Sequence, residues 1–164
     1  MISLEFLPTL LQSTQVTLLV LVLAAPLTVV VAFVFGLARL SPLAPVRITA
    51  RVLVEFFRGV SALILLFWLF FALPLLGVSL PPIACAVLGI ALSAGSYGAE
   101  IVRSAIIAVP RVQREAATAL NFSRGQAMLR IILPQAIVVM LPPFGNLMIE
   151  VLKSTALVSM ITVA

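Results

Sequence analysis

The sequence contains no histidine and no aspartate, and its acidic residues are five glutamates. An intramembrane aspartyl protease needs two aspartates and a serine–histidine hydrolase needs its histidine, so neither catalytic site can form. Cys85 is the single cysteine and lies in an apolar stretch, which excludes a disulfide framework and a cysteine–histidine metal site. The sequence has no glycine-rich phosphate loop, so the chain binds no nucleotide through a P-loop. This inventory predicts a protein without catalytic residues, cofactor or metal.

Charge is also scarce. Of the 164 residues 9% are charged and 63% are hydrophobic, and the mean hydropathy is +1.32. A soluble domain has about a quarter of its residues charged, and one of this length could not bury so much apolar surface. The sequence therefore predicts an integral membrane protein surrounded by the lipid bilayer. The net charge of +5 is assigned to cytoplasmic loops, where Lys and Arg accumulate, and not to a nucleic-acid partner.

Uncharged stretches place the membrane spans. A helix of about 20 residues rises roughly 30 Å and crosses the hydrocarbon core, and residues 6–38 carry no charge. The uncharged stretch 59–99 is too long for one span and is divided by Gly77 and Pro81–Pro82. The sequence thus predicts about four spans, at Thr17–Leu37, at Ser61–Leu76, from Pro82 onward and within 131–149.

Arginines set the orientation of these spans. They form two clusters, Arg39, Arg47, Arg51 and Arg58 in the first and Arg103, Arg111, Arg114, Arg124 and Arg130 in the second. Because such clusters mark cytoplasmic segments, the N-terminus is expected outside. Prolines at 134, 142 and 143 predict a kinked or interrupted fourth helix. After Lys153 the apolar run is too short to span, so a truncated last helix is expected.

A polar insert between two predicted spans carries the most informative pattern. Residues 109–135 read VPRVQREAATALNFSRGQAMLRIILPQ. Residues 115–120 favour a short helix by propensity, and Asn121 tolerates the left-handed conformation that ends one. Ser123 suits the N-cap of a second short helix through Arg130. We expect a helix, a sharp turn and a helix at the cytoplasmic face; a solvated basic loop is the alternative.

The spacing in this insert resembles the EAA signature of ABC importer permeases, E-A-A-x3-G-x9-I-x-L-P. Glu115-Ala116-Ala117 is followed after three residues by Asn121, and after nine more by Ile131-x-Leu133-Pro134. The sequence departs from the signature at Asn121, where the family usually has glycine. Since both residues suit a left-handed turn, the loop is expected to keep its shape.

Further segments resemble those of polar amino-acid permeases. Val54–Gly59 is similar to their E-x-F-R-G-T-P segment, with Val60-Ser61 in place of Thr-Pro. Three others resemble Y-x-A-E-I-x-R, P-P-x-x-N and L-K-D-T-S-L, and they are Tyr97–Arg103, Pro142–Asn146 and Leu152–Leu157. Within the family, Ala119–Ser123 and Leu157–Ser159 most resemble permeases for ectoine and hydroxyectoine.

The resemblance implies an all-α transmembrane bundle of the type I ABC importer permease kind. Residues 1–164 would form one permease domain, incomplete at its C-terminus, and 109–135 its cytoplasmic coupling loop. The implied partners are ABC ATPase subunits, a second permease of the same or a different chain, and an extracytoplasmic solute-binding protein that delivers a small polar solute. The implied location is the bacterial inner membrane, with ATP hydrolysis left to the ATPase.

Six residues are predicted to couple the permease to the ATPase, namely Glu115, Ala116, Ala117, Asn121, Ser123 and Pro134. Glu115 would meet a basic group of the ATPase, and the two alanines would let the helix sit deep in a groove. Simpler explanations are an acid that favours the helix dipole and alanines that favour helix formation.

Five residues are assigned to the solute pathway, namely Lys153, Ser154, Thr155, Glu100 and Asn146. Lys153 would offer a cation to a solute carboxylate, pair with Glu150, or reach a membrane interface. Ser154 stands where the family usually has aspartate, which favours a zwitterionic or neutral solute. Glu100 either pairs with Arg103 or contributes to a gate, and Asn146 either bonds another helix or meets the solute.

Two other functions fit a membrane protein of this composition. A secondary transporter or channel would need internally paired ionisable residues and no ATPase. A non-transporting assembly or sensor subunit would not need a complete helix bundle. The EAA spacing argues against the first of these alternatives.

Overall fold

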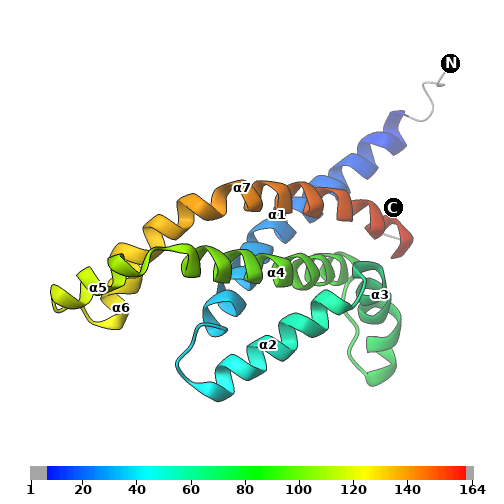
Figure 1. The fold of residues 1–164 in the computed structure, drawn as a ribbon. Coiled ribbons are helices and arrows are strands. Elements are labelled where there is room, and N and C mark those ends of the chain that lie inside the picture. The colour runs from blue at the N-terminus through cyan, green and yellow to red at the C-terminus, as the bar shows by residue number, and fades with distance from the viewer. Residues whose placement is uncertain (1–6, 162–164) are drawn as a thin grey trace.

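The described chain is built from helices. The computed structural model describes residues 7–161, and the side chains of residues 13–158. Its α-helices are α1 (Leu7–Ala38), α2 (Ala44–Gly59), α3 (Ala62–Phe67), α4 (Pro82–Ala108), α5 (Arg111–Ala119), α6 (Arg124–Ala127) and α7 (Leu133–Ser154) (Figure 1). Irregular helical turns complete it, namely η2 (Trp68–Ala72), η3 (Leu73–Leu76), η4 (Met128–Ile132) and η5 (Thr155–Ile161). The predictions for the first residues and for the end of the last helix fall partly outside the described range.

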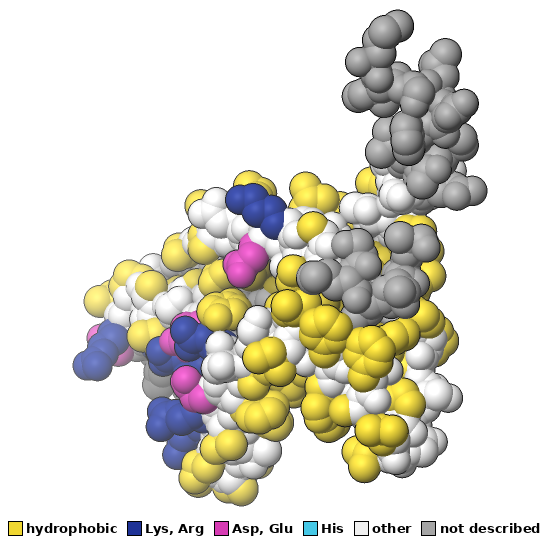
Figure 2. All heavy atoms as spheres, turned by 90° about the vertical axis from the view of Figure 1, so that its right-hand side faces the viewer, with side chains coloured by type: hydrophobic (Ala, Val, Ile, Leu, Met, Phe, Trp, Pro, Cys, Tyr) yellow, Lys and Arg dark blue, Asp and Glu magenta, His cyan; other side chains and the backbone are white. Residues whose placement is uncertain are grey.

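Three described helices are long and apolar enough to cross a membrane, and a fourth span is formed if a bent pair counts as one. The three are Ser13–Ala38, Pro82–Ala108 and Arg124–Val158, which confirms the first, third and fourth predicted spans. Most charged side chains gather toward one side of the molecule, and apolar atoms cover much of the rest (Figure 2). The α5–α6 hairpin lies on the same side of the bundle as the junction between α1 and α2.

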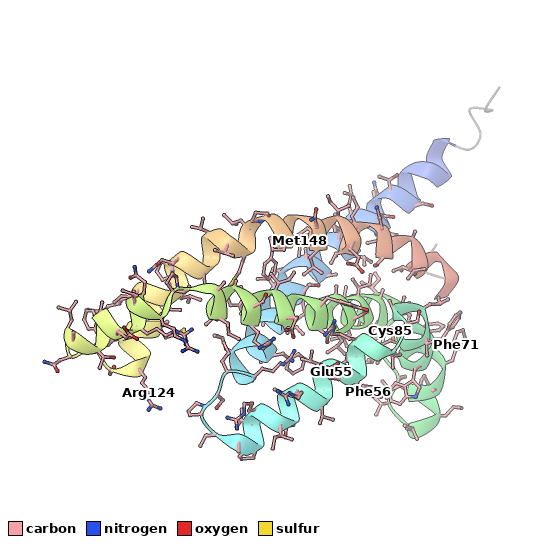
Figure 3. All side chains as sticks on the ribbon, in the orientation of Figure 1. Glu55, Phe56, Phe71, Cys85, Arg124 and Met148 are labelled. Atoms are coloured by element: carbon pink, nitrogen blue, oxygen red, sulfur yellow. The ribbon has the colours of Figure 1, made fainter. Side chains whose placement is uncertain are left out.

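The second predicted span is wrong in its extent. Residues 62–76 are too short to cross alone; only together with α2 are they long and apolar enough, as a pair bent by 100° that forms either a broken span or a re-entrant loop. Val60 has extended backbone at the bend. The number of arginines in α2 suggests a loop when the sequence alone is considered. In the structure these arginines recur along one side of a helix, while apolar residues such as Ile48, Val52 and Phe56 are exposed on another side. Glu55, next to Phe56 (Figure 3), belongs to the charged side.

Small residues bring α1 and α4 together. Ala24, Thr28 and Ala32 recur every fourth residue on α1 and are fully buried. They face glycines of α4: a Cβ added at Gly95 would lie 2.6 Å from Val31 Cγ1, and one at Gly98 would lie 2.6 Å from Ala32 Cβ. Close approach through small residues is how membrane helices gain packing energy without a hydrophobic effect. Gly95 and Gly98 therefore serve the close packing of α4 against α1.

Filling this contact is expected to destabilise the subunit. Gly95→Val would force the two helices apart, and overpacking of this kind costs about 1–3 kcal/mol. Gly145→Ala is the control, because nothing lies within 4 Å of a Cβ added there. Thermal unfolding in detergent, followed by loss of the monodisperse peak in size-exclusion chromatography, should show a lower midpoint for the first variant alone. An unchanged midpoint for Gly95→Val would contradict the packing described.

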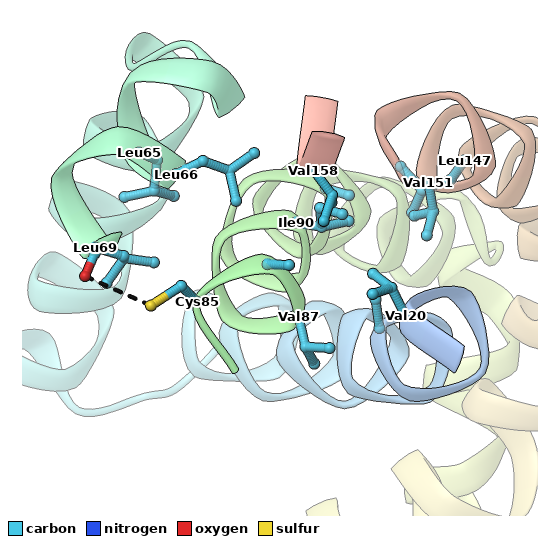
Figure 4. Close-up of a cluster of buried hydrophobic side chains, with 13 residues drawn as sticks. Val20, Leu65, Leu66, Leu69, Cys85, Val87, Ile90, Leu147, Val151 and Val158 are labelled. Atoms are coloured by element: carbon cyan, nitrogen blue, oxygen red, sulfur yellow. Dashed lines mark hydrogen bonds between the residues drawn. The ribbon is translucent and has the colours of Figure 1, made fainter. Parts of the chain in front are cut away.

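One apolar cluster holds α3 and η2 against α4. Leu65, Leu66 and Leu69 pack over Cys85 and Ile90, and the Cys85 Sγ lies 3.5 Å from the Leu69 carbonyl oxygen (Figure 4). A second cluster joins α4 to η4 and α7, and its members include Val102, Ile106, Ile132 and Met140. These contacts fix the C-terminal half of α4 against α7 and thereby position the hairpin between them.

The fourth helix departs from regular α-helical geometry next to Pro134, as predicted, but not at Pro142 and Pro143. Pro142 and Pro143 lie inside α7, which stays continuous and curves gently. The irregular turn lies earlier, where η4 has π-helical geometry directly before Pro134. A proline removes one backbone donor and clashes with the preceding turn, and a wider turn relieves that clash.

Candidate functional site

The insert 109–135 forms the predicted helical hairpin. Helix α5 ends at Ala119, and Asn121 follows with a φ of 56°, the left-handed value expected of it. The Phe122 amide donates to the Ala117 carbonyl oxygen at 3.0 Å, which closes the turn. The chain thus reverses over a few residues. The left-handed residue turns the backbone so that the amides after the helix can donate to carbonyl oxygens of its last turn.

Ser123 caps the second helix as predicted. The Gln126 amide donates to Ser123 Oγ at 3.3 Å, and the Ser123 amide donates to Gln126 Oε1 at 2.9 Å. This reciprocal capping box satisfies two amides at the start of α6. The hairpin is therefore a defined structure and not a solvated loop, and Arg124 projects from it (Figure 3).

One face of α5 is exposed and nearly free of large polar groups. Glu115, Ala116 and Ala119 are exposed on it, together with Val112, whose exposed fraction is 69%. Leu120 extends the same face at 67%. A small, apolar surface with one acid is suited to a groove in another protein. Ala117 lies on the opposite, buried face, so within this subunit it packs against the chain itself.

Arg114 ties the hairpin to the preceding span. Its Nη2 donates to the Ile106 carbonyl oxygen at 2.9 Å, in the last turn of α4. Arginines near a helix C-terminus commonly bond its last carbonyls. In the sequence Arg114 belongs to the second arginine cluster, and its position a few residues after the end of a helix is the signal that indicates this bond. Pro134, by contrast, is exposed near the start of α7 and ends the η4 turn.

A charged cluster links α1, α2 and α4. The Arg103 Nη2 lies 2.5 Å from Glu100 Oε1, which confirms the predicted ion pair within α4. Arg39, whose side chain is 8% exposed, pairs with the other oxygen of Glu100 and lies 3.9 Å from Glu55 Oε1. Sequence reasoning missed Arg39 because its partner is 61 positions away.

Polar residues of α7 form a stripe on one side of that helix. Asn146, Glu150 and Lys153 are spaced for one face, and all three are exposed. The opposite side lines an apolar groove of about 420 Å³ against α1, with Phe144 and Met148 among its residues. Among the described side chains no ion pair joins Glu150 to Lys153, and Asn146 bonds no other helix. The structure therefore contradicts the Glu150–Lys153 pairing.

The hydroxyls of Ser154 and Thr155, at the end of the stripe, bond to backbone carbonyls of the preceding helical turn. Ser154 Oγ donates to the Glu150 carbonyl oxygen at 2.9 Å, and Thr155 Oγ1 donates to the Leu152 carbonyl oxygen at 2.6 Å. Thr155 is buried. The proposed pathway residues thus fall into two groups, with Asn146 and Lys153 on the open side of α7 and Glu100 in the charged cluster.

Comparison with known proteins adds a family match. A model described as "Binding-protein-dependent transport system inner membrane component" matches residues 26–164. A probable amino-acid ABC transporter permease protein, y4tF, of Sinorhizobium fredii is 52% identical over 139 residues, covering 81% of this chain and 58% of the relative. The chain thus spans less than two thirds of that relative's length.

Another relative and a solved structure agree with this match. A probable amino-acid ABC transporter permease protein, YckA, of Bacillus subtilis is 38% identical, covering 99% of this chain and 72% of its own length. A crystal structure described as an amino acid ABC transporter with histidines superposes with a TM-score of 0.85 at 31% identity, covering 97% of this chain and 76% of the solved one. The helical arrangement therefore has a solved counterpart.

Proposed function

The chain belongs to the family of binding-protein-dependent transport system inner membrane components, and from this premise we propose that it is the permease subunit of an ATP-driven importer for polar amino acids. Its fold is that of type I ABC importer permeases, and it is a multi-pass protein of the inner membrane. The relatives are described as permease proteins, which makes the chain a transport subunit and not an enzyme.

The α5–α6 hairpin carries this proposal. It is rigid, capped, fixed to the end of α4 by Arg114, and presents Glu115 and Ala116 outward. We propose that α5 sits in a groove of a partner ATPase and that Glu115 meets a basic group there. When ATP closes the ATPases, the hairpin moves with them, and α4 and α7 on either side switch the cavity between inward- and outward-facing states.

The exposed stripe on α7 is proposed to face the solute. Charged groups inside a membrane segment are costly and turn toward partners or water-filled cavities. Lys153 and Glu150 present opposite charges about one helical turn apart, which suits the two charges of a zwitterion. Ser154 adds a hydroxyl in place of a further acid, so a cationic side chain on the solute has less to bind. A second permease would enclose this side, and a binding protein would deliver the solute outside.

The narrower assignment to ectoine remains a second candidate. It rests on the resemblance of Ala119–Ser123 and Leu157–Ser159 to permeases for ectoine and hydroxyectoine. Ectoine is a zwitterion and would meet the same α7 stripe. Residues of the hairpin do not contact the solute, however, so the amino-acid proposal is preferred.

Purification and uptake together test the function. The tagged chain, purified from its own cells in mild detergent, should bring along a P-loop ATPase identified by mass spectrometry. The complex is reconstituted in proteoliposomes together with its binding protein. Label from a ¹⁴C-amino-acid mixture should accumulate in the vesicles only when ATP is present on the side of the membrane that carries the ATPase. Uptake of ¹⁴C-ectoine alone would favour the second candidate. A stable chain without any ATPase, or uptake without ATP, would contradict the proposal and favour secondary transport.

A further inference from the structure

Arg58 places a cation in the last turn of α2, beside the bend of the α2–α3 pair, without a carboxylate partner in the described part of the chain. The ion pairs formed there all lie in the cluster of Arg39, Glu55, Glu100 and Arg103. The Arg58 Nε is buried and has no hydrogen-bond partner. Glu55, one turn earlier on α2, is directed to Arg39 instead. An intramembrane ionisable group of this kind marks a functional site unless a partner is found for it.

Tyr97 of α4 fixes the position of this cation. The Arg58 Cζ lies 5.3 Å from the centroid of the Tyr97 ring, a cation–π arrangement. The Tyr97 hydroxyl donates to the Arg58 carbonyl oxygen at 3.3 Å. The ring is still 40% exposed, so the pair borders open space and is not closed in the core.

This pair lies at the level of the α7 stripe. Tyr97 precedes the end of α4 at Ala108 by eleven residues, or about 16 Å of helix. It adjoins Gly98, where an added Cβ would lie 3.0 Å from Leu147 Cδ2 of α7. Asn146 adjoins Leu147 in turn, so Tyr97 and Asn146 lie at a similar height along the contact between α4 and α7, while α2 lies on the other side of α4 (Figure 1). Lys153 lies about two turns further along α7, toward the other end of the span.

We propose that the Arg58 guanidinium binds the carboxylate of the transported solute, and that Tyr97 is a positioning residue that holds it on the pathway. This inference rests on the proposed function and names a second cation beyond Lys153. An arginine suits the task, because its planar fork binds a carboxylate through two parallel hydrogen bonds.

A structural role for the same pair gives different expectations. Arg58 lies in the last turn of α2, where a cation favours the helix dipole, and its stacking on Tyr97 would hold the bend between α2 and α3. Loss of such a role lowers the yield of the complex and its ATPase activity together with uptake. Loss of a binding role lowers uptake per ATP and leaves the other two unchanged.

The experiment compares variants of the reconstituted complex with a ¹⁴C-amino-acid mixture as the probe. Arg58→Gln is expected to reduce uptake per ATP hydrolysed by about tenfold or more, as loss of a charge-assisted hydrogen bond implies. Arg58→Lys keeps the charge and should retain more uptake than Arg58→Gln. Tyr97→Phe, which keeps the ring, should transport better than Tyr97→Leu. Arg51→Gln, an exposed arginine of the same helix, is the matched control.

The outcomes separate this inference from the function on which it rests. If the wild-type complex takes up no labelled amino acid, the proposed function fails and the inference fails with it. If the wild type transports and Arg58→Gln keeps the same uptake per ATP, the inference alone is overturned. Equal losses of yield, ATPase and uptake would also overturn it in favour of the structural role. Should Arg58→Gln not assemble, reduced uptake per ATP in assembled Arg58→Lys supports the site, and an unchanged ratio overturns it.

Discussion

Ala116→Trp is expected to reduce the amount of ATPase that co-purifies with the subunit by about thirtyfold or more, while the subunit itself stays folded. Ala116 is exposed on the face of α5 that also carries Glu115 and Ala119. If that face fills a groove of the ATPase, an indole in place of a methyl group must push the two proteins apart. Changes at the centre of an interface cost about 2 kcal/mol or more, which corresponds to that factor.

The matched control is Thr118→Trp, an equally bulky change two residues later. Thr118 is exposed on the other flank of α5, where its Oγ1 donates to the Arg114 carbonyl oxygen. It should leave most of the ATPase bound. Quantitative mass spectrometry of the purified complex gives the ratio of ATPase to permease for each variant. Equal losses from both variants would show that general damage to the hairpin, and not docking of one face, explains the result.

Glu115→Ala is expected to act more weakly and in a different way. Removing one exposed acid leaves the shape of α5 intact, so the ATPase should remain bound while uptake per ATP falls. A bulky residue at Ala117 would be a less direct test, although the sequence pattern assigns Ala117 to the same groove. Because Ala117 is buried within the subunit, such a change would distort the hairpin itself and would not report on the groove. Ala116 is therefore the better site for the test.

How well the sequence predicted the site depended on the range of each interaction. The turn at Asn121 and the cap at Ser123 are formed by neighbours in the chain, and their residue types required that geometry. The link from Arg114 to Ile106 spans a helix boundary that the sequence placed only approximately. The pairing of Arg39 with Glu100 could not be read at all, because it depends on how α1 and α4 pack.

The fold shows the same dependence. Long uncharged runs predicted α1, α4 and α7, since length and apolar composition decide whether a helix crosses a membrane. Helix α2 was missed because its arginines resemble a cytoplasmic loop when only their number is counted. Its exposed apolar face and its contacts with α4 depend on tertiary packing, which the number of charges does not reveal. The pairing of Arg58 with Tyr97, on which the solute proposal now rests, comes from that same misjudged segment.

Glu100→Gln is expected to destabilise the subunit by about 3 kcal/mol, the lower end of the range for breaking a buried ion pair. The change leaves Arg39, which is 8% exposed, and Arg103 without their shared acceptor at short range. The side chain of Glu100 is itself 31% exposed, so water compensates part of the loss. The shift in the midpoint of reversible unfolding in mixed detergent, followed by circular dichroism, measures the effect.

Glu55→Gln provides the comparison within the same cluster. The Glu55 side chain is 59% exposed and its oxygen lies 3.9 Å from Arg39, and exposed pairs contribute about 1 kcal/mol or less. Both substitutions remove a charge near Arg39, so a difference between them reports the closer contacts of Glu100, with Arg39 and with Arg103. Replacing both partners, Arg39→Met with Glu100→Leu, should recover part of the stability lost by Glu100→Gln, because the buried arginine is then removed together with its acceptor. The charges left without a partner are those of Arg103 and Glu55, whose side chains are 33% and 59% exposed. If Glu55→Gln costs as much as Glu100→Gln, long-range attraction to the arginines sets the stability of this end of the bundle, and the contact between α1 and α4 does not.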